Sequence, residues 1–584
     1  MRRPARHGRG AGLSALAAAG VLAVSGLATA GPASPAGAAA SSSATPRIVW
    51  GDCTSASLLA AKAECGMLSV PLDHAKPSGK KIKLALSRQK AVPGVKRQGV
   101  MLANPGGPGG EGLALSNLRD IVPNGAGQGY DWIGFDPRGV GESRPRISCD
   151  PNYHVGPRLD YEPTTGVTGP LSATEKGWLN RSKKYAAACG AKHGDLLRHM
   201  RTTDTIKDME LIRRALGADK ISFYGFSYGT YLGQAYATLH PTRVHRMVLD
   251  GNVDVRGIWY GAQLEQDKAF EKVIQQFFGW VAKYDRVYQL GTTAKQVRAQ
   301  YEAMLVKLRK KAAGTIGPSE WGDAFVRAGY AESLWPQTAD GFAAAVHEKD
   351  FTLLEILYDS AETPGDDNGF AVYNAVQCTD VAWPRSYEKG WRKDGFATAA
   401  SAPFMTWGNV WYNTACIYWP APAGTPLKID GSKAPPILIV NTVGDAATPY
   451  RGALHVRSLF PRARLVAEQG STTHSNSLSG NTCVDNTVAT YLATGRLPAR
   501  KAGTAADKLC KATPRPVPAQ VGFGESFAEQ PAEQPAEQST EQPAAQSAPE
   551  DVTPTPGPSS KPSRYPQTDT SLLHTITGLL PTER

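Results

Sequence analysis

Short apolar segments alternate along the chain with longer segments whose apolar residues recur at helical spacing. A short apolar run between turn residues is typical of a buried strand, and alternation of such strands with helices indicates a mostly parallel α/β sheet. The strands predicted in this way are 99–103, 131–135, 221–224, 244–249, 436–441 and 463–467.

This strand pattern is interrupted between about residue 251 and residue 430, where helical spacing predominates. The interruption holds nine of the twelve tryptophans of the chain. Aromatic residues at this density would form the core of a separate layer and its contact with the sheet, and they also suit a substrate cleft. We therefore predict an α/β domain in two parts (41–250 and 431–512) with a large, mainly helical cap (251–430) inserted between late strands.

The two ends of the chain differ in composition from the rest. Four arginines precede an uncharged stretch over 11–30, and small residues at 28–30 or 38–40 offer cleavage sites, as in a secretory signal. The alternative is an uncleaved membrane anchor, but this stretch is only mildly apolar. From residue 513 to residue 584 the chain is rich in Pro, Glu and Gln, which predicts a disordered tail. We expect a signal peptide over 1–40 and a secreted, extracellular protein without a stable membrane anchor.

Eight cysteines agree with export, since an oxidising compartment preserves disulfides. They form four neighbouring couples, and short loops favour sequential pairing among the many connectivities that eight cysteines allow. The couples are Cys53 with Cys65, Cys149 with Cys189, Cys378 with Cys416, and Cys483 with Cys510. A metal site is the alternative, but the C-x-x-C and Cys/His spacings that hold zinc are missing from the sequence.

The formal net charge is +12, which suits weak attraction to anionic cell-wall polymers or acidic peptides. Nucleic-acid binding is disfavoured, because basic residues form no compact stripe with interleaved aromatics. Solvated surface charge is the simpler explanation.

The segment Gly225-Phe226-Ser227-Tyr228-Gly229 carries the clearest chemical signal. It lies between the strand predicted over 221–224 and a helix predicted over 230–239, as a nucleophile elbow does. Small residues are needed on both sides, because the serine backbone is strained and its hydroxyl must stand clear of the sheet. The alternative is a glycine-rich turn at a helix cap. We predict a nucleophilic serine at Ser227.

A serine hydroxyl needs an imidazole to take its proton and a carboxylate to orient that imidazole. Asp445 follows the strand over 436–441, and His474 follows the next strand, in the chain order Ser, Asp, His that this architecture uses. Asp250, at the end of the strand over 244–249, competes with Asp445 for the acid role, or forms a turn with Gly251.

The tetrahedral intermediate of acyl transfer carries an oxyanion, which needs two backbone N–H donors. One is expected from Tyr228, directly after the serine, and the other from Gly107 in the glycine-rich loop 104–110. A phosphate-binding loop is the alternative for so many glycines, but no Lys-Ser/Thr pair follows them.

With these residues the chain resembles the secreted tripeptidyl aminopeptidases of actinomycetes, in the prolyl aminopeptidase branch of the α/β-hydrolases. The resemblance extends from about Cys65 to Cys510, and the motifs that carry it occur in the family's order. They are Val70-Pro71-Leu72-Asp73, Asn104-Pro105-Gly106-Gly107-Pro108-Gly109, Phe135-Asp136-Pro137-Arg138-Gly139-Val140-Gly141, the stretch 224–251, Gln377-Cys378-Thr379-Asp380, and the stretch 445–449. By similarity, Ser227, Asp445 and His474 occupy the triad positions, and Gly107 and Tyr228 the oxyanion hole.

The resemblance implies a serine exopeptidase that needs no metal or organic cofactor. Its substrates would be peptides with a free N-terminus, whose ammonium is held by acids such as Asp380 or Glu111. The alternative for each of these two is a structural hydrogen-bond acceptor or a solvated carboxylate, which sequence position favours, because the position of a charged residue alone is weak evidence for a site. Pro105 replaces the histidine that usually precedes the paired glycines in prolyl aminopeptidases, so a strict proline preference is not implied. An esterase or lipase with the same triad, or a non-catalytic binding protein of this fold, are the alternatives.

Overall fold

The computed structural model describes residues 47–519. The signal segment predicted over 1–40 lies outside the described residues, as does the predicted tail from residue 520 onward. No helix of the described part is both long and apolar enough to cross a membrane.

A ten-stranded sheet forms the base of the structure, in the order β1-β2-β3-β5-β4-β6-β7-β8-β9-β10. Pairing from β5 through β10 is parallel, whereas β1, β2 and β3 form an antiparallel edge. The strands are β1 (Val49–Asp52), β2 (Glu64–Pro71), β3 (Lys81–Gln89), β4 (Gly99–Asn104), β5 (Tyr130–Phe135), β6 (Ile221–Phe226), β7 (Val244–Asp250), β8 (Leu438–Thr442), β9 (Arg464–Gln469) and β10 (Lys508–Lys511). The six strands predicted from the sequence are therefore confirmed, within a few residues at their ends.

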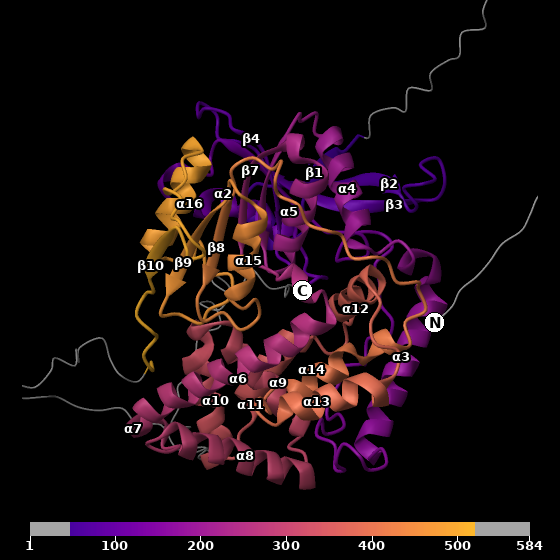
Figure 1. The fold of residues 1–584 in the computed structure, drawn as a ribbon, viewed down its shortest axis with the longest axis vertical. Coiled ribbons are helices and arrows are strands. Elements are labelled where there is room, and N and C mark those ends of the chain that lie inside the picture. The colour runs from indigo at the N-terminus through magenta and orange to yellow at the C-terminus, as the bar shows by residue number, and fades with distance from the viewer. Residues whose placement is uncertain (1–46, 520–584) are drawn as a thin grey trace, which may run out of the picture. The chain divides into compact units, whose positions relative to one another are not determined.

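The central parallel strands β5, β6 and β8 are buried along their whole length, because helices cover both faces of the sheet (Figure 1). On one face, α4, α5 and α15 pack on alternate strand residues such as Leu102 and Phe223. On the other face, α2 and α16 pack on the intervening residues, such as Met101 and Tyr224. The helices and 3₁₀ turns of this domain are α1 (Ala56–Ala60), η1 (Leu113–Asn117), α2 (Leu118–Ile121), η2 (Pro123–Gly125), α3 (Ala173–Leu197), α4 (Thr202–Ala215), α5 (Tyr228–Leu239), η3 (Pro241–Arg243), α15 (Arg451–Leu459) and α16 (Thr482–Thr494).

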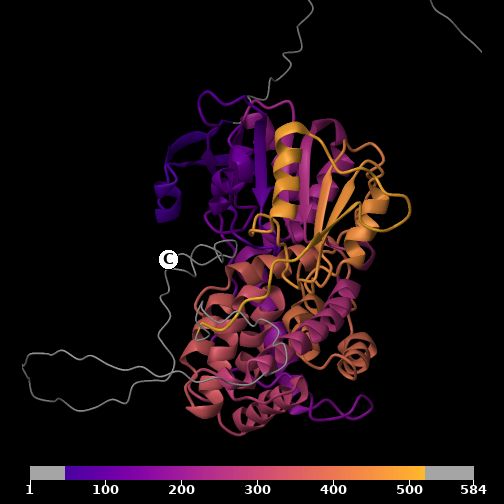
Figure 2. The same ribbon diagram turned by 90° about the vertical axis from the view of Figure 1, so that its left-hand side faces the viewer.

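A helical layer follows β7 and ends before β8, so the chain leaves the sheet and returns to it in the interval where the sequence predicts a cap (Figures 1 and 2). Its first part, α6 to α11, encloses an aromatic core of its own, while α12 to α14 pack with α3 on the main core. The elements are η4 (Val255–Gly257), α6 (Tyr260–Lys283), α7 (Asp285–Tyr288), α8 (Ala294–Lys310), α9 (Pro318–Tyr330), η5 (Glu332–Leu334), α10 (Trp335–His347), α11 (Thr352–Glu362), α12 (Asn368–Asp380), the π-turn η6 (Tyr387–Trp391), α13 (Arg392–Ala399), α14 (Thr406–Asn413) and η7 (Thr414–Ile417). The chain therefore has an α/β-hydrolase fold with a large helical insertion.

The segment after β10 lies against this helical layer. Arg515 donates to Glu332 Oε1 at 3.0 Å and to Gln276 Oε1 at 2.7 Å, and the Trp280 indole donates to Pro516 O at 3.0 Å. Contacts with the folded part thus continue beyond residue 513, where the composition predicts the tail to begin. An ion pair and an indole hydrogen bond hold a segment that has few apolar residues.

Four disulfides join the cysteines as sequential neighbours: Cys53–Cys65, Cys149–Cys189, Cys378–Cys416 and Cys483–Cys510. The pairing that short loops favour is the one observed. Each bridge closes a loop of 12 to 40 residues and so restricts the unfolded chain.

Candidate active site

Ser227 lies in the sharp turn between β6 and α5, with φ 54° and ψ −124°. This conformation is strained for a residue with a side chain, as expected of a nucleophile elbow. A Cβ on Gly225 would come within 2.5 Å of Gly229 O, and one on Gly229 within 2.7 Å of Asn104 O. Both glycines are therefore required by close backbone approach. The Ser227 N–H donates to Asp250 O at 2.9 Å, which fixes the turn to the end of β7.

Asp445 and His474 meet beyond the ends of β8 and β9. His474 Nδ1 lies 2.9 Å from Asp445 Oδ2 and 3.0 Å from Oδ1. Thr448 holds the same carboxylate, since its N–H donates to Oδ1 and its hydroxyl to Oδ2, each at 2.8 Å. Asp445 is thus buried, and the two bonds from Thr448 fix the orientation of its carboxylate toward the imidazole.

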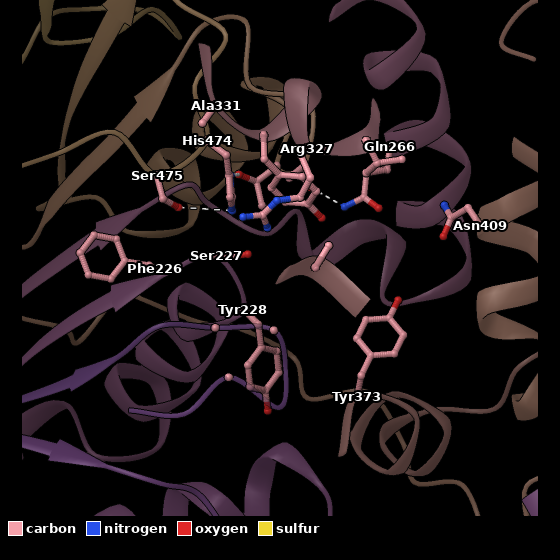
Figure 3. Close-up of a pocket in the computed structure, with 18 of the residues that line it drawn as sticks. Phe226, Ser227, Tyr228, Gln266, Arg327, Ala331, Tyr373, Asn409, His474 and Ser475 are labelled. Carbon is pink, nitrogen blue, oxygen red and sulfur yellow. Dashed lines mark hydrogen bonds between the residues drawn. The ribbon is translucent and has the colours of Figure 1, made fainter. Parts of the chain in front are cut away.

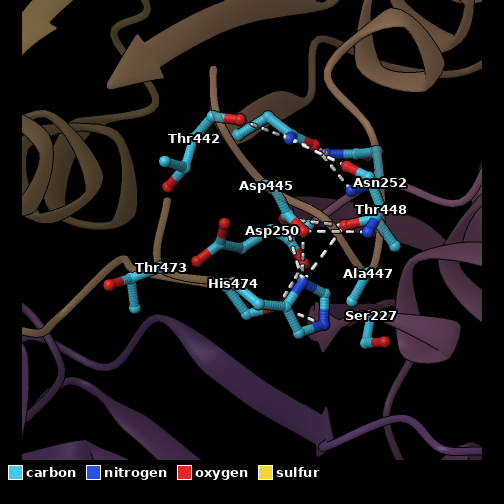
Figure 4. Close-up of polar contacts among 12 residues, drawn as sticks. Ser227, Asp250, Asn252, Thr442, Asp445, Ala447, Thr448, Thr473 and His474 are labelled. Atoms are coloured by element: carbon cyan, nitrogen blue, oxygen red, sulfur yellow. Dashed lines mark hydrogen bonds and ion pairs between the residues drawn. The ribbon is translucent and has the colours of Figure 1, made fainter. Parts of the chain in front are cut away.

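The other nitrogen of the imidazole faces the serine side of the site. Figure 4 shows Ser227 beside the edge of the His474 ring that carries Nε2. Ser475 Oγ lies 3.3 Å from this Nε2 and also donates to Asp250 O at 3.2 Å. Burial lowers the pKa of His474, but the charges of Asp445 and Asp250 and the hydrogen bond to Asp445 outweigh it, and the pKa is raised above its usual value. The imidazole is therefore arranged to accept a proton and to carry the resulting charge.

Asp250, the competing acid, is held elsewhere. Its Oδ2 accepts from the N–H of Ser477 at 2.8 Å and from the hydroxyl of Ser477 at 2.6 Å. Burial raises the pKa of Asp250 to about 7, although the bonds from Ser477 oppose this change. No hydrogen bond joins its carboxyl to His474 within residues 47–519, so the geometry favours Asp445 as the partner of the imidazole.

The glycine loop after β4 lies directly against the elbow. A Cβ on Gly106 would come within 2.8 Å of Ser227 Cβ and 3.0 Å of Tyr228 N. The Gly106 N–H already donates to Asn104 Oδ1 at 3.1 Å, whereas the N–H of Gly107 has no partner among the described hydrogen bonds. Gly106 and Gly107 both have φ near 100°, which favours glycine. Gly106 thus packs on the elbow, and Gly107 and Tyr228 both line the cavity beside Ser227.

A cavity of about 940 Å³ opens over these groups, between the sheet and the helical layer. Ser227, His474, Tyr228 and Gly107 all line it, together with residues of α6, α9, α12 and α14. Figure 3 shows side chains from several of these helices around Ser227. The position of the predicted nucleophile at the floor of a cavity covered by the insertion suits a substrate that enters beneath the cap.

The two acids proposed for the substrate ammonium are placed differently. Asp380 is not among the residues that line the cavity. Its oxygens accept from the N–H and hydroxyl of Thr202 at 2.7 and 2.6 Å and from the Trp259 indole at 3.3 Å. Burial raises its pKa to about 6. These contacts give the Asp380 carboxylate structural partners and favour a structural role for it over an ammonium-binding one. Glu111 does line the cavity, 4.0 Å from the guanidinium of Arg146.

Three further groups at the site were not found from the sequence. Thr448 holds Asp445 and could have been found, since it stands three residues after the aspartate in the same loop. Glu332 accepts from Ser471 and Thr472, in the loop that leads to His474. Arg327, on α9, reaches into the cavity. The last two lie in the cap, where local sequence carries no sign of the loop or cavity they will face.

The arrangement suits acyl transfer to a serine hydroxyl, because the imidazole is hydrogen-bonded to a carboxylate and Ser227 lies beside its other nitrogen (Figure 4). No hydrogen bond between Ser227 and His474 is found in residues 47–519, where Ser475 is the hydroxyl within 3.3 Å of Nε2. Within the described range, no cluster of three or more His, Cys, Asp or Glu side chains could hold a metal ion.

Comparison with known proteins agrees with this chemistry. The model of the TAP-like protein family matches residues 402–507. The chain is 40% identical over 495 residues to the tripeptidyl aminopeptidase of Streptomyces lividans, covering 81% of this chain and 89% of that protein. It is 31% identical over 475 residues to the serine protease Hip1 of Mycobacterium tuberculosis, covering 77% and 89%. It is also 30% identical over 457 residues to carboxylesterase B of the same species, covering 75% and 85%.

Proposed function

Because the chain belongs to the tripeptidyl aminopeptidase family of serine peptidases, we propose that it is a secreted exopeptidase that releases short peptides, tripeptides above all, from free N-termini. The observation that carries the mechanism is the Asp445–His474 hydrogen bond at 2.9 Å beside Ser227. The disulfides support export, because such bonds persist in oxidising compartments.

In the proposed reaction, His474 Nε2 accepts the proton of the Ser227 hydroxyl as Oγ attacks the peptide carbonyl. The oxyanion accepts hydrogen bonds from the N–H groups of Tyr228 and Gly107. The C–N bond then breaks, and His474 gives its proton to the leaving amine. A water molecule, deprotonated by His474, attacks the acyl-enzyme and releases the N-terminal peptide. Asp445 keeps the proton of the neutral imidazole on Nδ1 throughout, so that Nε2 is free to accept.

The free N-terminus is proposed to lie near an acid that lines the cavity. Three extended residues span roughly 10 Å, which a cavity of about 940 Å³ accommodates. Glu111 stays the candidate for the ammonium, because its half-exposed carboxylate lines the cavity next to the glycine loop.

The test compares tripeptidyl anilides whose amino groups are free or acetylated. We expect turnover of the free form and a loss of at least about tenfold in kcat/KM on acetylation, since the carboxylate that binds the N-terminus would lose its ammonium partner. Glu111→Gln should remove most of this difference, and Ser227→Ala should abolish turnover of both substrates. Equal cleavage of free and acetylated substrates would contradict exopeptidase action.

An esterase is the second candidate, because one relative bears the name carboxylesterase B and the same three groups would acylate on an ester. Short-chain nitrophenyl esters beside the anilides separate the two. Ester turnover without any peptide turnover would favour this alternative.

A further inference from the structure

Arg327 differs from the other arginines that line the cavity. Arg146 pairs with Asp366 at 2.6 Å, Arg256 with Asp254 at 2.6 Å and Arg451 with Glu265 at 3.0 Å. Arg327 forms no ion pair with any acid of residues 47–519, and its Nε is buried without a hydrogen-bond partner.

The acid whose charge acts on this guanidinium already has another partner. Glu362 lines the cavity and influences Arg327 through space, but its carboxylate lies 2.8 Å from His154 Nδ1. Burial lowers the pKa of Arg327, as expected of a cation that lacks a close counterion. A buried charge without a partner is costly, so the cavity carries a cation that an incoming anion would stabilise.

The position of Arg327 indicates which part of a bound substrate it would contact. It precedes Tyr330 by one helical turn, on the same face of α9. Tyr330 O accepts from the backbone N–H of His474 at 2.8 Å, and the two rings lie 5.7 Å apart. In Figure 3 the side chains of Arg327 and His474 both border the space next to Ser227. Because the imidazole hands its proton to the leaving amine, groups on this side of the site face the leaving part of the substrate.

We propose that Arg327 is a specificity-determining residue that binds a carboxylate on the leaving side of the scissile bond. This inference rests on the proposed peptidase function and refines its substrate class. The carboxylate is supplied either by the C-terminus of a short leaving group or by an acidic side chain of the first leaving residue. In both cases a charge-assisted pair forms with the guanidinium and positions the bond to be cleaved.

The experiment compares four substrates that share one N-terminal tripeptide. They are a tetrapeptide with a free C-terminal carboxylate, the same tetrapeptide as its C-terminal amide, an amide with Glu as the fourth residue, and the tripeptidyl anilide. We expect the wild type to prefer the free acid over the neutral amide by about ten- to a hundredfold in kcat/KM, as for a hydrogen bond to a charged group. A preference for the Glu amide would assign the acidic side chain as the source instead.

Arg327→Met should abolish that preference while anilide turnover changes by less than about threefold, since the anilide has no carboxylate. Arg327→Lys should retain part of the preference for the carboxylate, because lysine keeps the positive charge but lacks the planar guanidinium that forms two parallel hydrogen bonds. Arg256→Met is the matched control, as it removes a cavity-lining arginine that already has a partner, and it should leave the preference intact.

The comparison of the four substrates with the wild type needs no variant, so it tests for a carboxylate subsite even if Arg327→Met does not fold. Anilide cleavage with equal turnover of the acid and both amides would overturn the subsite and leave the peptidase function standing. An equal loss on all four substrates in a folded Arg327→Met variant would also overturn it. Failure of the wild type to cleave any of the four would remove the peptidase function, and the subsite with it.

Discussion

Replacement of Asp445 by Asn tests the orientation of the imidazole. The Thr448 backbone N–H donates to Asp445 Oδ1. Because a backbone N–H can only donate, the amide oxygen of Asn must occupy the Oδ1 position. Its NH₂ group then stands at the Oδ2 position, 2.9 Å from His474 Nδ1, and donates to that nitrogen. The proton of the neutral imidazole is thereby moved to Nε2. In this tautomer His474 cannot accept the proton of Ser227.

The expected cost follows from that wrong tautomer. A triad whose aspartate is replaced by asparagine loses about 10⁴ in kcat, and we expect about 10³ to 10⁴ here. This corresponds to about 4 to 5.5 kcal/mol in the activation free energy. KM should change little, because the carboxylate does not line the cavity and contacts no substrate. The thermal midpoint should fall only slightly, since the Thr448 hydroxyl can turn to donate elsewhere.

Asp250→Asn is the matched control, because Asp250 is also a buried aspartate close to His474. Its carboxyl bonds Ser477 and not the imidazole, so we expect a loss of less than about tenfold in kcat, as for removal of a charge at a distance. The assay is the initial rate with a free-amine tripeptidyl anilide, measured for both variants from pH 5 to pH 9. A larger loss in Asp250→Asn than in Asp445→Asn would refute the assignment of the acid.

The pH profile gives a second readout of the same variants. Activity requires neutral His474, so kcat/KM should rise with pH through the raised pKa of this residue. Removal of either negative charge should lower that pKa and move the acidic limb of the remaining activity to lower pH. A limb that moves to higher pH would contradict the electrostatic account.

Three further predictions concern groups around the site. Thr448→Val should lower kcat by about ten- to a hundredfold in the anilide assay, because Asp445 Oδ2 loses a hydrogen-bond donor. Thr448→Ser keeps the hydroxyl and should retain most of the wild-type kcat. An equal loss of kcat in both variants would contradict this role of the hydroxyl. Asp380→Asn should leave KM unchanged and destabilise the fold, because the Trp259 indole would meet an NH₂ group. The raised pKa of Asp380 stabilises the wild type at low pH, and this stability is lost as pH rises from about 4 to about 6. The difference in thermal midpoint between wild type and variant should therefore be larger at pH 4 than at pH 7. Replacement of Cys149 and Cys189 by serine should lower the free energy of unfolding by about 4 kcal/mol in urea titrations, and an unchanged value would argue against loop closure as the cause.

The parallel strands and the elbow could be predicted because their signals are local. A strand buried on both faces is a continuous apolar run, and a serine in a strained turn needs glycines at fixed distances, so β6 and Ser227 stand out in the sequence. Asp445 and His474 were found because each follows one of these strands. The antiparallel edge strands β1 to β3 were not predicted, since exposed positions interrupt β2 and β3 and almost all of β1 is exposed, so that none of them is a continuous apolar run.

Contacts between segments that are distant in the chain could not be predicted from the sequence. The sequence leaves Asp380 open between an ammonium-binding and a structural role, because the contacts of its carboxyl with Thr202 and Trp259 come from segments far away in the chain. Arg327 and Glu332 have no local pattern, because their importance comes from the loop of His474 that packs on the end of α9. The composition after residue 513 predicts a tail, yet contacts of Arg515 and Pro516 with Glu332, Gln276 and Trp280 hold the start of that segment on the cap.

The most direct test of the central claim is to identify the nucleophile by covalent labelling. The purified protein would be treated with a fluorophosphonate and digested, and the modified peptide identified by mass spectrometry. We predict a single adduct on Ser227, lost in Ser227→Ala and slowed by several orders of magnitude in His474→Ala. An adduct on Ser475, whose hydroxyl lies 3.3 Å from His474 Nε2, or labelling that persists at full rate without His474, would contradict the proposed relay.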